Sequence, residues 1–111
     1  MGPSRILGHA LKRGEVWLAE VGAKRRPVLV LTRTAVLDVR LLVTVAEITT
    51  SVRGLAAEVA LDDTIGLDQP SVVNCDGLHT VTQASLSEFV GSVSDSTMSQ
   101  VCIAARYALG C

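Results

Sequence analysis

The sequence has no apolar run long enough to cross a membrane. A transmembrane helix needs roughly 18 uninterrupted apolar residues, whereas Val28–Leu31 is ended by Thr32 and Arg33. The apolar stretch Ile6–Leu11 is too short and too interrupted for a secretory signal. We therefore expect a cytoplasmic protein.

Metal and nucleotide motifs are also missing. Cys75, Cys102 and Cys111 are odd in number and widely spaced, and His9 and His79 stand at no ligand spacing from them. There is no CxxC, glycine-rich phosphate loop, GxSxG elbow or HExxH motif. We expect free thiols in a reducing compartment, and neither a metal nor a cofactor.

Apolar residues, by contrast, are abundant for so short a chain. Of its 111 residues, 49% are hydrophobic and 19% are charged, with a mean hydropathy of +0.43. A small domain has a large surface for its volume and should need many polar residues. An apolar surface buried against a second copy would explain the excess. We therefore expect a soluble homodimer.

Charge is unevenly distributed along the chain, although the net charge is only −1. Residues 1–53 contain nine Lys/Arg and four Asp/Glu, a net +5, whereas residues 54–111 contain one arginine and seven acids, a net −6. A locally basic surface can bind phosphate on a protein of neutral overall charge. Halves of a sequence need not be halves of a structure, and in that case the basic residues would form no single face.

Short β-type segments follow one another from Glu15 onward. Asp76-Gly77 is predicted to be a tight hairpin turn between two of them. The predicted strands are Glu15–Val21, Arg26–Thr34, Arg40–Thr49, Glu58–Leu61, Ser71–Cys75, Leu78–Thr82 and Glu88–Ser92.

One helix is predicted at the end of the chain. It is capped by Ser94 or Asp95, runs to about Leu109 and stops at Gly110. Its apolar stripe comprises Met98, Val101, Cys102, Ala105 and Leu109. Several short strands with one terminal helix predict a mainly β antiparallel barrel, a single domain over residues 13–111 preceded by a flexible leader, residues 1–12.

Two polar clusters could carry chemistry. Lys24-Arg25-Arg26 leads into one predicted strand, and Thr49-Thr50-Ser51 ends another. The planar guanidinium of arginine suits phosphate oxygens, and a threonine hydroxyl both donates and accepts hydrogen bonds. The combination suits a phosphodiester better than acyl or redox chemistry.

Four segments in order carry a family resemblance. They are RGEVW (Arg13–Trp17), RPVLVL (Arg26–Leu31), AEIT (Ala46–Thr49) and SVVNCDGLHTV (Ser71–Val81). Over about residues 13–109 the chain resembles the MazF/PemK toxins of bacterial type II toxin–antitoxin pairs. The resemblance implies a compact SH3-like antiparallel barrel of the CcdB/PemK kind with a C-terminal helix.

The resemblance also implies an activity and partners. The activity would be metal-independent, sequence-specific cleavage of single-stranded RNA, whether messenger, transfer or ribosomal. Attack by a ribose 2′-OH would leave a cyclic phosphate and a 5′-OH. A homodimer held inactive by an antitoxin would be expected, with no membrane and no DNA partner. The sequence does not specify the cleavage site or the antitoxin.

By the same resemblance, Arg26 and Thr49 are the catalytic pair. Arg26 would stabilise charge developing on the phosphate, with Pro27 restricting its backbone, and Thr49 would hold a phosphate oxygen or the 2′-OH in line. Without the resemblance, a solvated loop charge and an ordinary strand-end threonine would be the simpler interpretations.

Glu47 departs from the family pattern. Strand alternation places it on the same face as Thr49, so it is a candidate general base for the 2′-OH. A salt bridge to a nearby arginine is the more common role for such a residue. Candidate RNA-binding residues are Lys24, Arg25, Arg53, Asn74, Asp76 and His79. Turn chemistry alone would explain Asp76, and a structural histidine would explain His79.

Two other functions remain open from the sequence. The first is a CcdB-like protein-binding toxin, a gyrase poison that would need no catalytic pair. The second is a catalytically inactive module that binds RNA or the antitoxin, because an intact Arg26/Thr49 pair does not prove the correct geometry.

Overall fold

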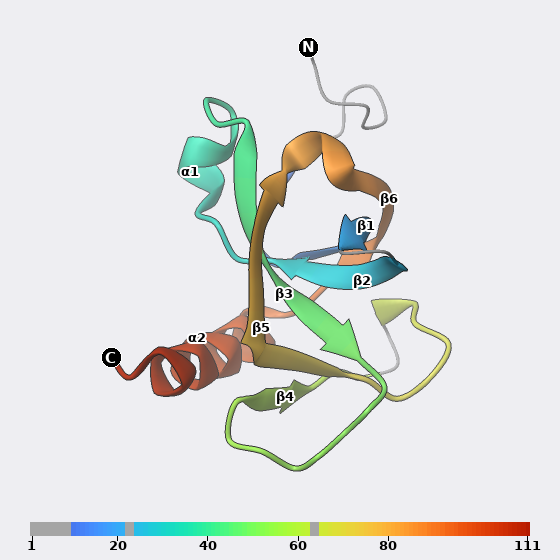
Figure 1. The fold of residues 1–111 in the computed structure, drawn as a ribbon, viewed down its shortest axis with the longest axis vertical. Helices are drawn as coiled ribbons and strands as arrows, with labels where there is room; N and C mark the ends of the chain where they lie inside the picture. The colour runs from blue at the N-terminus through green and yellow to red at the C-terminus, as the bar shows by residue number, and fades with distance from the viewer. Residues whose placement is uncertain (1–9, 22–23, 63–64) are drawn as a thin grey trace.

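The strands of this protein form one antiparallel sheet with a helix packed against it. A computed structural model describes residues 10–21, 24–62 and 65–111. The elements are β1 (Glu15–Val21), β2 (Lys24–Val30), α1 (Thr34–Leu37), β3 (Leu42–Thr49), β4 (Glu58–Ala60), β5 (Val72–Thr82), η2 (Gln83–Ser85), β6 (Leu86–Ser92) and α2 (Asp95–Leu109). The strand order is β4-β5-β3-β2-β1-β6, and α2 packs on β5 and β4 (Figure 1). The predicted mainly β fold with a C-terminal helix is confirmed; within the described ranges, however, the sheet does not close on itself.

Both faces of this sheet bury apolar side chains. Because successive side chains of a strand alternate between faces, Leu29 belongs to one cluster, whereas Val28 and Val30 belong to the other. The first cluster, under α2, includes Val16, Leu29, Ala46, Ile48, Val73, Val101 and Ala104. The second includes Leu11, Trp17, Val28, Val30, Leu37, Val43, Val45 and Leu86. Burial on both faces explains why β2 has a continuous apolar run.

The predicted hairpin at Asp76-Gly77 is wrong. Residues 72–82 form one bent strand, β5, and both of its halves pair with β3 (Figure 1). The register passes from Ala46↔Leu78 to Glu47↔Asn74, so Cys75–Gly77 form a bulge in β5. The dipeptide is a local turn signal, but continued pairing with β3 keeps the chain running in the same direction.

The second predicted strand was also too long at its C-terminal end. β2 ends at Val30, and Thr34–Leu37 form a short helix that the sequence did not indicate. After Val30 the chain turns toward Arg13, whose guanidinium donates to the Leu31 carbonyl and whose backbone N–H donates to Thr34 Oγ1 at 3.0 Å. Leu31 still donates its N–H to the Thr44 carbonyl at 2.9 Å, and the strand does not continue beyond it.

The predicted ends of the C-terminal helix are confirmed. The Ser94 side chain accepts from the Thr97 N–H at 3.1 Å, and Gly110 ends α2 in the left-handed conformation, with φ of 76°. The packed stripe differs from the predicted one at its end, because Ala104 is buried while Leu109 is 64% exposed.

The beginning of the predicted leader, residues 1–9, lies outside the described residues. Leu11 is buried in the second cluster, and the Lys12 N–H donates to Glu15 Oε1 at 3.0 Å. The packed domain therefore begins at least two residues before the predicted boundary at Arg13. No helix in the described part of the chain is long and apolar enough to span a membrane.

Candidate active site

One face of β2 and β3 changes from apolar to polar along its length. On β3, Val43 and Val45 are buried in the second cluster, and alternation places Glu47 and Thr49 farther along the same face. On β2, Arg26 occupies the corresponding place beyond Val28 and Val30. The polar half lies where these strands leave the buried core.

Arg26 and Thr49 lie beyond the last paired residues of β2 and β3. The last β2–β3 pair is Val28↔Glu47, and extending this antiparallel register by two residues sets Arg26 opposite Thr49. Beyond that pair the strands separate and leave an open cleft of about 250 Å³. Its lining residues are Arg26, Glu47, Thr49, Ser51, Arg53, Leu55, Glu58, Asn74 and Asp76.

The β5 bulge supplies one wall of this cleft. Asn74 pairs with Glu47 of β3 on one side and with Glu58 of β4 on the other, which forms a polar row across three strands. The Asn74 Oδ1 accepts from the Asp76 N–H at 3.0 Å. A Cβ on Gly77 would lie 3.2 Å from Glu47 Cδ and 3.2 Å from Asn74 Nδ2, so glycine lets the bulge pack closely against the row.

The carboxylate of Glu58 holds the loop that follows β3. Its Oε1 accepts from the backbone N–H groups of Arg53 at 3.0 Å, Gly54 at 2.9 Å and Leu55 at 3.3 Å, and its Oε2 accepts from Arg53 at 3.3 Å. Gly54 has a φ of 72°, which suits glycine. These bonds fix the backbone that carries Arg53 into the cleft.

The Thr49 hydroxyl is oriented at the end of β3. Its Oγ1 accepts from the Ser51 N–H at 3.0 Å. Because one hydroxyl oxygen can accept and donate at once, its hydrogen can still donate to a group bound in the cleft.

The Glu47 carboxylate is paired with His79. Its Oε2 is in hydrogen-bond contact with the Nε2 of that histidine, and the two side chains are 24% and 36% exposed. Glu47 therefore has a side-chain partner, as its simpler role predicted, but the partner is a histidine and not an arginine.

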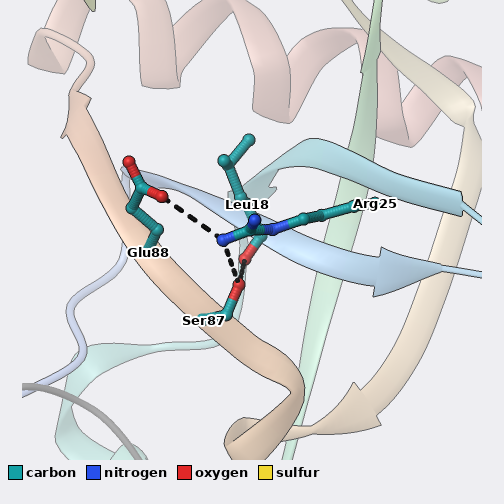
Figure 2. Close-up of polar contacts among 4 residues, drawn as sticks. All are labelled: Leu18, Arg25, Ser87 and Glu88. Carbon is teal, nitrogen blue, oxygen red and sulfur yellow. Dashed lines mark hydrogen bonds and ion pairs between the residues drawn. The ribbon is translucent and has the colours of Figure 1, made fainter.

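Two of the predicted RNA-binding cations lie away from the cleft lining. Arg25 alternates to the face opposite Arg26, and its Nη2 donates to Ser87 Oγ at 3.2 Å and Glu88 Oε1 at 3.3 Å on β6 (Figure 2). Ser87 in turn donates to the Leu18 carbonyl. Lys24 is exposed at the start of β2 and does not line the cleft.

The structure thus brings six of the nine predicted site residues together. They are Arg26, Glu47, Thr49, Arg53, Asn74 and Asp76. His79 joins them through Glu47, whereas Lys24 and Arg25 do not. Ser51, which also lines the cleft, belongs to the polar cluster Thr49-Thr50-Ser51 noted from the sequence. Leu55 and Glu58 were not predicted, and the available signal for Glu58 was a carboxylate soon after the Gly54 turn.

Behind the bulge, one cysteine has a perturbed pKa. Burial raises the pKa of the Cys75 thiol from 9.0 to about 11, with further contributions from Asp76 and Cys102. Because the thiolate is the nucleophilic form, Cys75 is a core residue and not a reactive group of the cleft.

The cleft can bind and polarise a phosphodiester. Two arginines supply fixed positive charge, Thr49 supplies a hydroxyl, and carboxylates and an amide supply acceptors and donors for bases or a ribose. Fold and cleft together define a small antiparallel β protein with a polar, charged cleft on one sheet face.

Comparison with known proteins identifies the family. A family model described as the PemK-like, MazF-like toxin of type II toxin–antitoxin systems matches residues 12–109. The chain is 53% identical over 68 residues to endoribonuclease MazF3 of Mycobacterium tuberculosis H37Rv, covering 61% of this chain and 66% of MazF3. It is 40% identical over 103 residues to probable endoribonuclease MazF5 of the same strain, covering 89% of this chain and 93% of MazF5.

Solved structures agree with this assignment. M. tuberculosis toxin MazF-mt6 superposes with a TM-score of 0.82 at 42% identity, covering 86% of this chain and 96% of that one. A mycobacterial endoribonuclease in complex with its cognate antitoxin superposes with a TM-score of 0.84 at 28% identity, covering 91% and 96%. The chain belongs to the PemK-like, MazF-like toxin family and has its SH3-like fold.

Proposed function

We propose that this chain is the toxin of a type II toxin–antitoxin pair and a metal-independent endoribonuclease specific for short sequences in single-stranded RNA. The observation that carries the proposal is that Arg26 and Thr49, from the neighbouring strands β2 and β3, line one open cleft. The relatives that match most of this chain carry the names probable endoribonuclease MazF5 and probable endoribonuclease MazF2.

In the proposed reaction the ribose 2′-oxygen attacks the adjacent phosphorus, the bond to the 5′-oxygen breaks, and a cyclic phosphate and a 5′-OH form. Arg26 stabilises the charge that develops on the phosphate oxygens, the kind of contribution that often dominates catalysis. Thr49 donates to one of those oxygens, and its bond from Ser51 fixes its orientation.

The proton balance assigns a role to Glu47. Its carboxylate accepts the 2′-OH proton, and the leaving 5′-oxygen takes a proton from water. Glu47 suits this role because it lines the cleft two residues before Thr49 on the same face. Arg53, Asn74 and Asp76 line the same cleft and would contact the RNA backbone and bases.

An antitoxin is the expected protein partner, since one structural neighbour was solved with its cognate antitoxin. The toxin would act in the cytoplasm as a homodimer. The exposed Ile103, Tyr107 and Leu109 on α2 leave apolar surface that a partner could cover.

The test is cleavage of a long single-stranded RNA in EDTA, with the fragment ends sequenced. We expect discrete cuts with 5′-OH ends, reduced at least 100-fold by Arg26→Ala and strongly by Thr49→Ala. Arg25→Ala is the matched control, because it removes a neighbouring arginine that is paired with Glu88 outside the cleft. Cutting by Arg26→Ala at the wild-type rate would refute the assignment. No cutting by any form would favour the gyrase-poison or binding-module functions.

A further inference from the structure

The partner of the Glu47 carboxylate, His79, is not one of the residues that line the cleft. Glu47 lines the cleft and His79 does not, yet the two side chains are in hydrogen-bond contact. His79 is the register partner of Val45, two residues before Glu47, so the contact runs diagonally across β3 and β5. Of this pair, the carboxylate and not the imidazole lines the cleft.

The Glu47 side chain is confined on two sides. Its Oε2 contacts His79 Nε2, and its Cδ lies 3.2 Å from the position that a Cβ on Gly77 would occupy. Among the residues that the structure describes, no partner is recorded for Oε1. One carboxylate oxygen is thus engaged and the other is left for the cleft.

We propose that His79 is a positioning residue that holds Glu47 for catalysis. It donates its Nε2–H to Oε2 and so keeps Oε1 directed at the 2′-OH, whose proton Oε1 accepts. This inference rests on the proposed function. A base must be held within a fraction of an ångström of its productive position. A glutamate with no hydrogen-bond partner would sample several rotamers and would occupy the productive one only part of the time.

Other charged groups near the pair do not replace this contact. Arg26 of β2, Arg53 of the loop, Glu58 of β4 and Asp76 of β5 all line the same cleft. None of them has a recorded hydrogen bond to Glu47 within the described part of the chain. The only hydrogen-bonding group that orients the carboxylate there is the imidazole.

The kinetic test compares His79→Ala with His79→Gln on a short RNA substrate. The alanine variant should lower kcat about 10- to 100-fold and change KM less than threefold, because positioning acts on the chemical step. Glutamine keeps an N–H donor of similar reach, so it should return kcat to within about fivefold of wild type. In the Glu47→Gln background, His79→Ala should have no further effect.

Thr80→Ala is the matched control. Thr80 is the next residue on β5, and its hydroxyl bonds Thr44 on β3 at 3.0 Å outside the cleft. Its loss should leave kcat unchanged. Wild-type kcat in His79→Ala, a glutamine variant as slow as the alanine variant, or additive effects with Glu47→Gln would each overturn the proposal.

A second measurement does not depend on RNA cleavage. Long-range ¹H–¹⁵N NMR spectra should show the neutral His79 ring protonated at Nε2 in the wild type, and this preference should be lost in Glu47→Gln. The same tautomer mixture in both proteins would overturn the positioning role. Failure of the wild type to cut RNA, with the Nε2 preference intact, would instead count against the proposed function.

Discussion

The two halves of one sheet face differ in chemistry although they share the same strands. In the apolar half, Val43 and Val45 pack with Trp17 and are almost completely buried. In the polar half, Glu47 and Thr49 continue the same face but line an open cleft. The change coincides with the Cys75–Gly77 bulge in β5. Substitutions in the apolar half should therefore mainly lower the free energy of unfolding. Substitutions in the polar half should mainly change RNA binding and cleavage.

The largest effect is expected for Trp17→Ala in the apolar half. Trp17 is fully buried, donates its indole N–H to Glu15 Oε1 at 3.0 Å and packs edge-on against Phe89, with ring centroids 5.6 Å apart. Removing so large a side chain should lower the free energy of unfolding by about 3–5 kcal/mol. Urea denaturation followed by circular dichroism would measure it.

The polar half supplies the control for this prediction. Glu47→Gln alters a pair whose side chains are partly exposed, so the free energy of unfolding should change by about 1 kcal/mol or less. If Trp17→Ala leaves too little folded protein, Trp17→Phe should show a smaller loss in the same direction. A Glu47→Gln variant as destabilised as Trp17→Ala would contradict the division between the two halves.

Local signals in the sequence predicted the elements whose boundaries depend on nearby residues. The bounds of β1 agree with its predicted range, and Ser94 and Gly110 cap α2 as predicted. The Asp76-Gly77 hairpin failed because the dipeptide's turn signal is local, whereas the pairing of both halves of β5 with β3 is long-range. The bend appears as a bulge and not as a reversal.

The candidate site was predictable only where local sequence signals position its residues. Alternation along a single strand placed Glu47 and Thr49 on one face, and the family resemblance singled out Arg26. The contacts of Glu58 with three backbone N–H groups depend on how the loop folds back, which no spacing specifies. Alternation along β2 separates Arg25 from Arg26, but the partners that Arg25 finds, Ser87 and Glu88, depend on the position of β6 beyond β1.

Alanine substitutions at two glycines, Gly91 and Gly77, should have effects of intermediate size. A Cβ on Gly91 would overlap the backbone carbonyl oxygen of Ile65, which cannot move alone, so Gly91→Ala should cost about 1–3 kcal/mol of stability. A Cβ on Gly77 would instead meet the side chains of Glu47 and Asn74. Gly77→Ala should therefore lower RNA cleavage about tenfold or more with a smaller loss of stability.

Thermal denaturation and initial cleavage rates on the same preparations would separate the two effects. The expected pattern is a lower Tm with near-normal activity per folded molecule for Gly91→Ala, and the reverse for Gly77→Ala. Equal losses of activity in both variants would indicate that the bulge does not position the cleft.

The smallest effect is expected at Glu58, which acts on the cleft through the loop. In the Glu58→Gln variant the side-chain amide would keep one carbonyl acceptor for the N–H groups of Arg53, Gly54 and Leu55 but would lose the charge that strengthens these bonds. This substitution should therefore loosen the loop and weaken binding of a non-cleavable 2′-O-methyl RNA about three- to tenfold. Because Arg26 and Thr49 belong to strands, kcat should change less than threefold.

The salt dependence of RNA binding can show whether Glu58→Gln weakens binding because Arg53 is misplaced. Removing one phosphate contact to a single strand lowers the slope of log K against log salt by about 0.7, and Arg53→Ala should show that change. Glu58→Gln should shift the slope in the same direction by a smaller amount, because the arginine is still present but less well placed. Glu88→Gln, a strand carboxylate paired with Arg25 outside the cleft, should bind RNA like the wild type. If Glu58→Gln lowered kcat without affecting affinity, its carboxylate would act on the reacting groups directly, and the loop would not be its route of action.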